Sequence, residues 1–149
     1  MRSREEILAL YLIAAESVRD EEFYIQALQR KNYLTREVIE RWRIGKSPTL
    51  RQALATGLSE IELREVGLLV DPHDDGPDGK PYMHFRSSLV IPFFASGEDR
   101  QAGRPGYFTS RRLSDYAADG TPLDKAKKAL SMPGPRPFRR RDTETRGNA

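Results

Sequence analysis

Lysine and arginine residues gather in the second half of the sequence, and aromatic residues lie among them. The guanidinium group is a planar fork that suits phosphate oxygens, and lysine adds a point charge on a flexible stem. Strands and loops that bear both can hold a single-stranded nucleic-acid backbone in register. Tyr107, Phe108 and Phe138 could offer stacking faces to unpaired bases, whereas in an arbitrary protein such aromatics are more often core residues. The candidate cations are Arg86, Arg111, Arg112, Lys125, Lys127, Lys128, Arg136, Arg139, Arg140 and Arg141.

The net charge of +3 conceals an asymmetry between the two halves of the chain. Residues Met1–Asp75 hold 11 Lys/Arg against 14 Asp/Glu, and Gly76–Ala149 hold 14 against 8. A basic half favours any polyanion, because binding it releases counterions. On charge alone, a soluble domain with a basic tail is an equally good interpretation.

Several other chemistries are excluded or have no support. Cysteine is absent, which excludes disulfides, thiolate nucleophiles and cysteine-based zinc sites. The acidic run DPHDDGPDGK starts like a calcium-binding EF-hand loop, but Tyr82 occupies the twelfth position, where that loop needs a bidentate glutamate. His84 has no nucleophile in a recognisable context and is interpreted as a partly buried strand histidine. We assign no metal to the run, whose members are interpreted as turn residues: Asp71, His73, Asp74, Asp75 and Asp78.

The length and composition describe one soluble domain. A chain of 149 residues can bury one core. No apolar run approaches the roughly 18 to 20 residues that a membrane span needs. The amphipathic N-terminal segment lacks the cleavage site of a signal peptide. We therefore expect a cytoplasmic protein that does not enter a membrane.

Helical patterns with clear start and stop signals occupy the first 67 residues. Apolar residues recur at helical spacing in the opening segment, at Ile7, Leu10, Ala14 and Val18. A second helix is expected around Glu21–Gln29. The residues that predict the caps and ends of three further helices are Thr35 and Gly45, then Ser47, Pro48 and Gly57, then Ser59, Glu62 and Gly67.

Beyond an exposed loop at Asp71–Lys80, the pattern becomes typical of strands. The predicted strands are Tyr82–Arg86, Leu89–Phe94 and Tyr107–Leu113. Pro92 indicates an edge strand or a strand end, and Ala95–Pro105 is expected to be a mobile loop. The sequence therefore predicts an α+β fold in residues 1–133, with N-terminal helices followed by a small antiparallel β-sheet. Residues 134–149 are expected to form a basic, disordered tail.

Three short segments in a fixed order, FRSSLVIPF, YFTSRRL and KKALSMPG with FRRR just beyond, resemble one family. They are similar to the N-terminal subdomain of the catalytic core of bacterial DnaG-type DNA primases, where the patterns read roughly FR.R..iPi, gFgGR.L and KYLNSP, followed by F-x-K. The resemblance covers roughly Glu21 to Arg141. Upstream, it includes a pattern near YL..RGL..e.i..f.iG, which matches at Leu34, Val38, Ile39, Trp42, Ile44 and Gly45.

The resemblance implies which side chains bind nucleic acid. Arg86, Arg111, Lys128 and Arg140 take the places of basic residues in the family patterns. The sequence also departs from those patterns at Ser88, Thr109, Ser110, Ala129 and Ser131, so some contacts of the family are lost. No catalytic residue is expected. The nucleic-acid-binding residues that we expect are Arg86, Arg111, Arg112, Lys127, Lys128, Arg139 and Arg140.

The function implied by the resemblance is binding of single-stranded template DNA during DNA replication and RNA primer synthesis. In the family a zinc ribbon precedes this segment, and a TOPRIM domain that follows it holds the metal-binding carboxylates needed for catalysis. We expect a separate TOPRIM-containing subunit or a replicative helicase as partner, Mg²⁺ only with that TOPRIM partner, and no primer synthesis by this chain alone. The chain would be a stand-alone or split version from a mobile or divergent replication system, or a remnant.

Two alternatives come from other classes of protein. The glycine-separated helices between Ser47 and Val66 could form a helix-turn-helix that binds duplex DNA, although the second helix carries Glu60, Glu62 and Glu65 against only Arg64. The chain could instead be a protein-interaction domain that assembles through the apolar face of its first helix. A basic groove on the sheet, a basic helix face or an exposed apolar patch would distinguish these three hypotheses.

Overall fold

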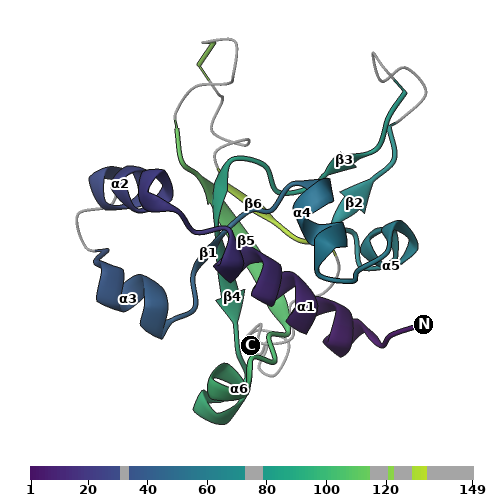
Figure 1. Ribbon diagram of the computed structural model, residues 1–149, viewed down its shortest axis with the longest axis horizontal. Helices are drawn as coiled ribbons and strands as arrows, with labels where there is room; N and C mark the ends of the chain where they lie inside the picture. Colours follow the sequence, from purple (N-terminus) through teal and green to yellow (C-terminus); the bar gives the residue numbers. More distant parts are fainter. Residues whose placement is uncertain (31–33, 73–78, 115–120, 123–128, 134–149) are drawn as a thin grey trace, which may run out of the picture.

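The computed structural model of the chain describes residues 1–30, 34–72, 79–114, 121–122 and 129–133 (Figure 1). Helices dominate the first half and strands the second, so the predicted α+β fold is confirmed. In order, the elements are α1 (Arg4–Ser17), α2 (Glu21–Arg30), α3 (Arg36–Arg41), β1 (Gly45–Lys46), α4 (Leu50–Ala55), α5 (Glu60–Glu65), β2 (Leu69–Val70), β3 (Tyr82–Met83), β4 (Ser88–Phe93), α6 (Gly97–Ala102), β5 (Tyr107–Arg112) and β6 (Ala129–Ser131). None of the helices in this described part is long and apolar enough to cross a bilayer.

Helix α1 begins at a capping box and buries one face against the sheet. The Ser3 hydroxyl accepts from the Glu6 amide at 3.2 Å, and the Glu6 carboxylate accepts from the Ser3 amide at 2.9 Å. The buried stripe differs from the predicted one. It includes more residues, and two of the predicted ones, Leu10 and Val18, are only half-buried. Its members are Ile7, Leu8, Tyr11, Leu12, Ala14 and Ala15.

Two of the predicted helix starts are confirmed and one is wrong. Thr35 caps α3, and Ser59 with Glu62 forms the capping box of α5. The helix expected at Ser47–Pro48 starts at Leu50 instead, because Thr49 forms a capping box with Gln52. Ser47 is buried and has another role: its hydroxyl accepts a hydrogen bond from the amide of Ser88 at 3.0 Å.

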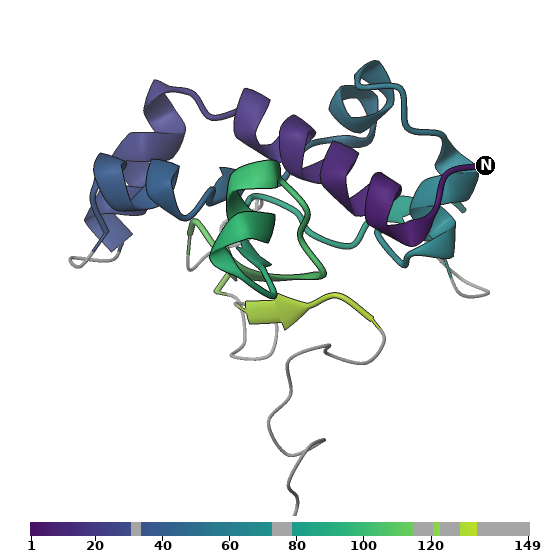
Figure 2. The ribbon, with the colours of Figure 1, turned by 90° about the horizontal axis from the view of Figure 1, so that it is seen from below.

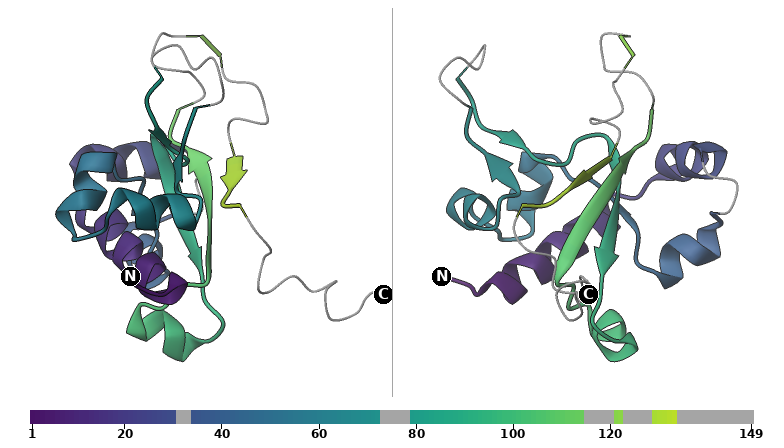
Figure 3. Two further views of the ribbon diagram at one scale, coloured as in Figure 1. Left: turned by 90° about the vertical axis from the view of Figure 1, so that its right-hand side faces the viewer. Right: turned by 180° about the vertical axis from the view of Figure 1, so that it is seen from behind.

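The main sheet has the strand order β1-β4-β5-β6, and all its strand pairs are antiparallel. Strands β4 and β5 form its centre, with Ser88 opposite Arg112 and Phe93 opposite Tyr107. Helix α1 crosses one face of this sheet, as the left view in Figure 3 shows. The ring centres of Tyr11 and Phe108 lie 5.1 Å apart at this contact. Figure 2 shows β6 on the side of the sheet away from α1. A second, two-stranded sheet pairs β2 with β3.

Among the residues that the structure describes, no strand pairs with the second half of β4 on its β1 side, so this edge of β4 is called free. Strand β1 pairs only with Leu89 and Val90. On the β1 side, the Ser88 carbonyl accepts from the Ser47 amide, and the Ser88 amide donates to the Ser47 hydroxyl. Pro92 lies four residues further along the strand, so its backbone groups point to the same side. The backbone nitrogen of Pro92, which carries no hydrogen, therefore points to the free edge. This confirms the edge position expected for this proline.

The connection between β4 and β5 contains a helix, so the prediction of a mobile loop at Ala95–Pro105 was wrong. Ser96 caps α6 by accepting from the Asp99 amide at 3.1 Å. Gly103 ends the helix in the left-handed conformation, at φ 75°. Arg43 holds α6 against α1, because its guanidinium donates to the Arg100 carbonyl at 2.9 Å and pairs with Glu16 at 2.8 Å.

Strand β1 lies directly against helix α1. A Cβ atom added at Gly45 would lie 2.7 Å from the carbonyl carbon, the oxygen and the Cβ of Ala15. Gly45 and Ala15 are both buried. The close approach of helix and strand therefore depends on the absence of a side chain at Gly45.

Glu62 links the start of α5 to the N-terminal segment. Its carboxylate accepts from the Arg2 guanidinium at 2.8 Å and from the Ser59 amide at 3.0 Å. Burial opposes ionisation of this carboxyl group, but the hydrogen bonds from Ser59 and Arg2 outweigh it. The net result is a Glu62 pKa below its usual value.

We expect the Glu62 contacts to make stability depend on pH in the acid range. Because the pKa is lower in the folded chain, the stabilisation is complete above the unfolded pKa of about 4.3. It is lost as the pH falls through the lower folded pKa. In thermal unfolding followed by circular dichroism, the Tm difference between the wild-type chain and Glu62→Gln should be clear at pH 7 and small at pH 3. A difference that does not change with pH would contradict this account.

Candidate nucleic-acid interface

Arg86 and Arg112 lie together at one end of the β4–β5 pair. Arg112 is the cross-strand neighbour of Ser88, and Arg86 precedes Ser88 by two residues. Arg86 is exposed and Arg112 is half-buried. Within the described part of the chain, neither guanidinium forms an ion pair with a carboxylate.

The environment of Arg112 disfavours its own positive charge. Burial lowers the pKa of Arg112, and repulsion from Arg86 lowers it further. The Arg112 Nε atom is buried and has no hydrogen-bond partner among the residues that the structure describes. Such a donor usually has a partner. Two adjacent cations without a compensating acid and with a free buried donor are suited to binding an anion.

The backbone that presents Arg86 is fixed on both sides. Its carbonyl accepts from the Ser88 hydroxyl at 2.7 Å, and the carbonyl of Ser87 accepts from the Leu113 amide at 2.9 Å. Ser87 has a φ of 50°, an uncommon left-handed conformation for a residue other than glycine. The Arg86 guanidinium lies 5.2 Å from the centre of the exposed Tyr82 ring. The turn is therefore rigid, while the side chain remains at the surface.

A cavity of about 250 Å³ lies beside Arg86. It combines hydroxyl groups and one guanidinium with apolar walls, a mixture that can take a sugar-phosphate group. Its lining residues are Ser47, Pro48, Thr49, Leu50, Met83, Phe85, Arg86 and Ser87.

Arg111 does not join the Arg86–Arg112 pair. Successive side chains of a strand point to opposite faces of the sheet, so Arg111 and Arg112 diverge. Arg111 is exposed, and its cross-strand neighbours are Leu89 and Ala129. Within the described residues, its guanidinium forms one long hydrogen bond, to the carbonyl of Ser110 at 3.4 Å. The structure thus places two of the expected cations together and a third on the other face.

The remaining expected binding residues lie outside the described residues. They are Lys127, Lys128, Arg139 and Arg140, with Lys125, Arg136, Phe138 and Arg141 from the wider candidate set.

The aromatic residues predicted to stack on bases are buried, so that prediction was wrong for the two that the structure describes. Tyr107 is 3% exposed, and its hydroxyl donates to the Met132 carbonyl at 3.0 Å. Phe108 is fully buried against α1. Both are core residues, as the alternative interpretation of these aromatics stated.

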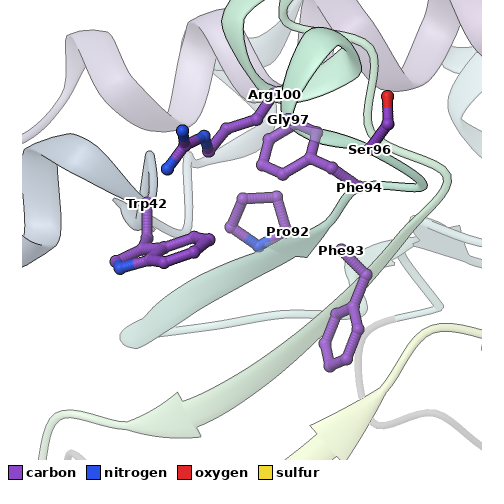
Figure 4. A pocket seen from close by; sticks show the side chains of 7 residues that line it. All are labelled: Trp42, Pro92, Phe93, Phe94, Ser96, Gly97 and Arg100. Carbon is purple, nitrogen blue, oxygen red and sulfur yellow. The ribbon is translucent and has the colours of Figure 1, made fainter.

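Exposed aromatic residues occur at the other end of β4, where the sequence predicted no site. A pocket of about 420 Å³ lies between the end of α3, the free edge of β4 and the start of α6 (Figure 4). Trp42 and Phe93 are 50% and 40% exposed there. The signal in the sequence was the only tryptophan of the chain, placed just after a short amphipathic helix. The lining residues are Trp42, Pro92, Phe93, Phe94, Ser96, Gly97 and Arg100.

Among the described residues, neither α5 nor the apolar face of α1 provides the surface that the two alternative hypotheses place on it. Helix α5 has only six residues, and its one cation, Arg64, pairs with Asp71 at 2.9 Å and with Glu60 at 3.5 Å. This helix therefore offers little to a major groove. The apolar face of α1 lies in the core of the same chain, which leaves Ile13 as its large exposed apolar residue.

The structure assigns no metal to the described residues, among which no group of three or more His, Cys, Asp or Glu side chains could hold an ion. Asp71 belongs to the ion pair with Arg64, and residues 73–78 of the acidic run lie outside the described part. His84 is half-buried, as expected, and its Nε2 lies 2.7 Å from the Ser131 carbonyl.

Comparison with known proteins relates the fold of this chain to one kind of domain. The sequence matches no family model and no curated protein. Solved structures do match. The DnaG primase catalytic domain bound to ssDNA has a TM-score of 0.59 at 20% identity, over 87% of this chain and 37% of that one. A DNA primase domain from Pseudomonas aeruginosa has a TM-score of 0.60 at 21% identity, over 89% of this chain and 38% of that one. The chain has the fold of part of a DnaG primase catalytic core.

A third DnaG primase structure adds a DNA complex. The RNA polymerase domain of Mycobacterium tuberculosis primase DnaG, in complex with a double-stranded DNA oligomer with a 6-nucleotide overhang, has a TM-score of 0.60 and 23% identity, over 90% of this chain and 39% of that chain. The present chain therefore spans about two fifths of the length of the primase domains it matches. The predicted resemblance is confirmed at the level of the fold.

Two of the five departures from the primase patterns, Ser88 and Ser110, are at buried positions of the sheet. Ser88 stands where the family pattern has a second arginine, and it is 1% exposed. Ser110 replaces a glycine, and its hydroxyl donates to the Leu130 carbonyl at 3.3 Å. These substitutions therefore remove one candidate cation and add a contact between β5 and β6.

Proposed function

We propose that this primase-like chain binds single-stranded DNA through the surface around Arg86 and Arg112. The observation that carries the proposal is the adjacency of these two arginines without a carboxylate partner among the described residues. A phosphate group would offset their mutual repulsion and would accept from the free Nε of Arg112. Two of the structurally similar primase domains were solved with DNA, which supports DNA as the kind of ligand.

The proposed DNA path continues from this pair along β5. Arg111 is exposed on the other face and would contact the backbone as the strand passes the β5–β6 side of the sheet. Lys127, Lys128, Arg139 and Arg140 are proposed to add further phosphate contacts. Phosphate contacts of this kind give affinity without sequence preference.

In the proposed role the chain presents template DNA to a partner that performs the chemistry. The partner would be a TOPRIM-containing subunit or a replicative helicase, in DNA replication and primer synthesis. The described residues do not assemble a carboxylate cluster for Mg²⁺. The proposal therefore assigns no metal-dependent step to a residue of this chain.

The test is the salt dependence of binding to a labelled oligothymidylate, followed by fluorescence anisotropy. Each neutralised phosphate of a single strand contributes a slope of about −0.7 to the plot of log K against log salt. Contacts from at least two arginines predict a slope of about −1.4 or steeper. Absence of binding at low salt, or a slope near zero, would contradict the proposal. A hairpin duplex serves as the comparison ligand, and tighter binding to it would favour a duplex-binding function.

A further inference from the structure

The pocket between α3, β4 and α6 is preformed and has aromatic walls. Figure 4 shows the Trp42 indole and the Pro92 ring side by side, with the Arg100 guanidinium next to them and Phe93 pointing away from Arg100. Pro92 and Phe93 are consecutive, so the pocket extends around the free edge of β4. Arg43 fixes the α6 wall through its hydrogen bond to the Arg100 carbonyl at 2.9 Å.

The pocket offers flat apolar surfaces together with positive charge. The Arg100 guanidinium lies 4.7 Å from the centre of the Trp42 ring, and that of Arg41 lies 5.9 Å from it. The Arg100 Nη1 atom is buried and has no hydrogen-bond partner among the residues that the structure describes. A ligand that fills this pocket therefore needs a planar ring for the indole and an acceptor oxygen for Arg100.

A nucleotide of a single strand satisfies both requirements. Its base can stack on an exposed aromatic ring, and such stacking tolerates any base because each has a π-face. Its phosphate or an exocyclic oxygen can accept from a guanidinium. A volume of about 420 Å³ is within the range of small-ligand sites.

The position of the pocket favours DNA over an acidic peptide. The pocket lies at the Phe93 end of β4, and the Arg86–Arg112 pair lies at the Ser88 end. Six strand residues separate the two sites by roughly 20 Å, a span that several nucleotides of one strand can cover. Between them the face away from α1 bears Ile91 and Thr109, both half-exposed, and the exposed Arg111, whereas Arg112 lies on the α1 side with Phe108. An extended anion that passes from the arginine pair to Arg111 and then along this face to Phe93 would meet the pocket.

We propose that Trp42 and Arg100 form a second DNA subsite, in which an unpaired base stacks against the indole while Arg100 binds its phosphate or exocyclic oxygen. This inference rests on the proposed single-strand function and adds to it a place for base contacts, which the buried Tyr107 and Phe108 do not offer. It also explains why the half-exposed indole and the free Arg100 donor occur together at a sheet edge.

Trp42 is the only tryptophan, so its fluorescence reports on this pocket alone. The wild-type chain is titrated with an oligothymidylate of about 12 nucleotides, within the site sizes of single-strand binders. We expect the fluorescence to be quenched with the same midpoint as the anisotropy of a labelled copy. Trp42→Leu should weaken the affinity roughly 10-fold, as expected for one lost stacking contact. Ile61→Ala, which removes another exposed apolar side chain on α5, should leave the affinity and the quenching unchanged.

Each other outcome overturns the inference. DNA binding with no quenching and no effect of Trp42→Leu would remove the subsite and leave the proposed function standing. No DNA binding by anisotropy at low salt would remove both. Quenching by a short peptide rich in Asp and Phe, but not by the oligonucleotide, would assign the pocket to a protein partner instead.

Discussion

We expect a chain in which Arg86 and Arg112 are both replaced by glutamine to bind single-stranded DNA at least about 100-fold more weakly than the wild-type chain at low salt. Each arginine is proposed to donate charge-assisted hydrogen bonds to phosphate, and such bonds contribute about 1.5 to 3 kcal/mol each. The salt slope should also become shallower by about 1.4, because two phosphate contacts are lost. Anisotropy titrations at several salt concentrations measure both quantities.

The same double substitution should not destabilise the fold. Burial and the neighbouring Arg86 both disfavour the charge on Arg112, so the wild-type chain holds this pair at a cost. Glutamine at both positions removes the repulsion, and the Tm should stay unchanged or rise. Loss of stability together with loss of binding would show that the two arginines are structural. Arg4→Gln with Arg64→Gln is the matched control for DNA affinity, because it removes the same charge from exposed arginines on helices away from the pair.

Gly45→Ala is expected to destabilise the chain by about 3 kcal/mol, at the upper end of the usual cost of overpacking. The added Cβ would lie 2.7 Å from backbone atoms of Ala15, which cannot rotate away as a side chain could. Helix α1 and strand β1 would have to separate, and the α1 face that packs on the sheet would lose contacts. Urea unfolding should show a lower midpoint with an unchanged m value.

The matched control for this change is Gly97→Ala in helix α6. A Cβ at Gly97 would meet nothing within 4 Å, and the position is helical. Because alanine favours a helix over glycine by up to about 1 kcal/mol, this variant should be as stable as the wild-type chain or slightly more stable. Equal losses in the two variants would show that the close approach of Gly45 to Ala15 is not the cause.

The sequence predicted those features that depend on neighbouring residues. The caps at Thr35 and Ser59 are local hydrogen bonds between residues three apart, so the residue types alone indicate them. The start at Ser47 was mispredicted because its hydroxyl accepts from Ser88, a partner 41 residues away. Helix α6 was missed because its short, polar sequence has no apolar face, and its anchor is a hydrogen bond from Arg43.

The candidate site was predicted in part for a similar reason. Arg86, Arg111 and Arg112 were expected from their types and from the family resemblance. Their arrangement depends on register: Ser88 opposite Arg112 brings Arg86 and Arg112 together, while strand alternation turns Arg111 away. The pocket at Trp42 joins three elements that are distant in sequence, so no local pattern could show it.

The free edge of β4 has a consequence for how copies of this chain meet. An exposed strand edge is a template on which a second molecule can pair, and that is a common start of aggregation. Here the pairing stretch beyond β1 is short, and Pro92 has no hydrogen to offer to an incoming strand. Pairing of two copies through this edge is therefore disfavoured. The same proline that lines the aromatic pocket thus also protects the edge of the strand that carries it.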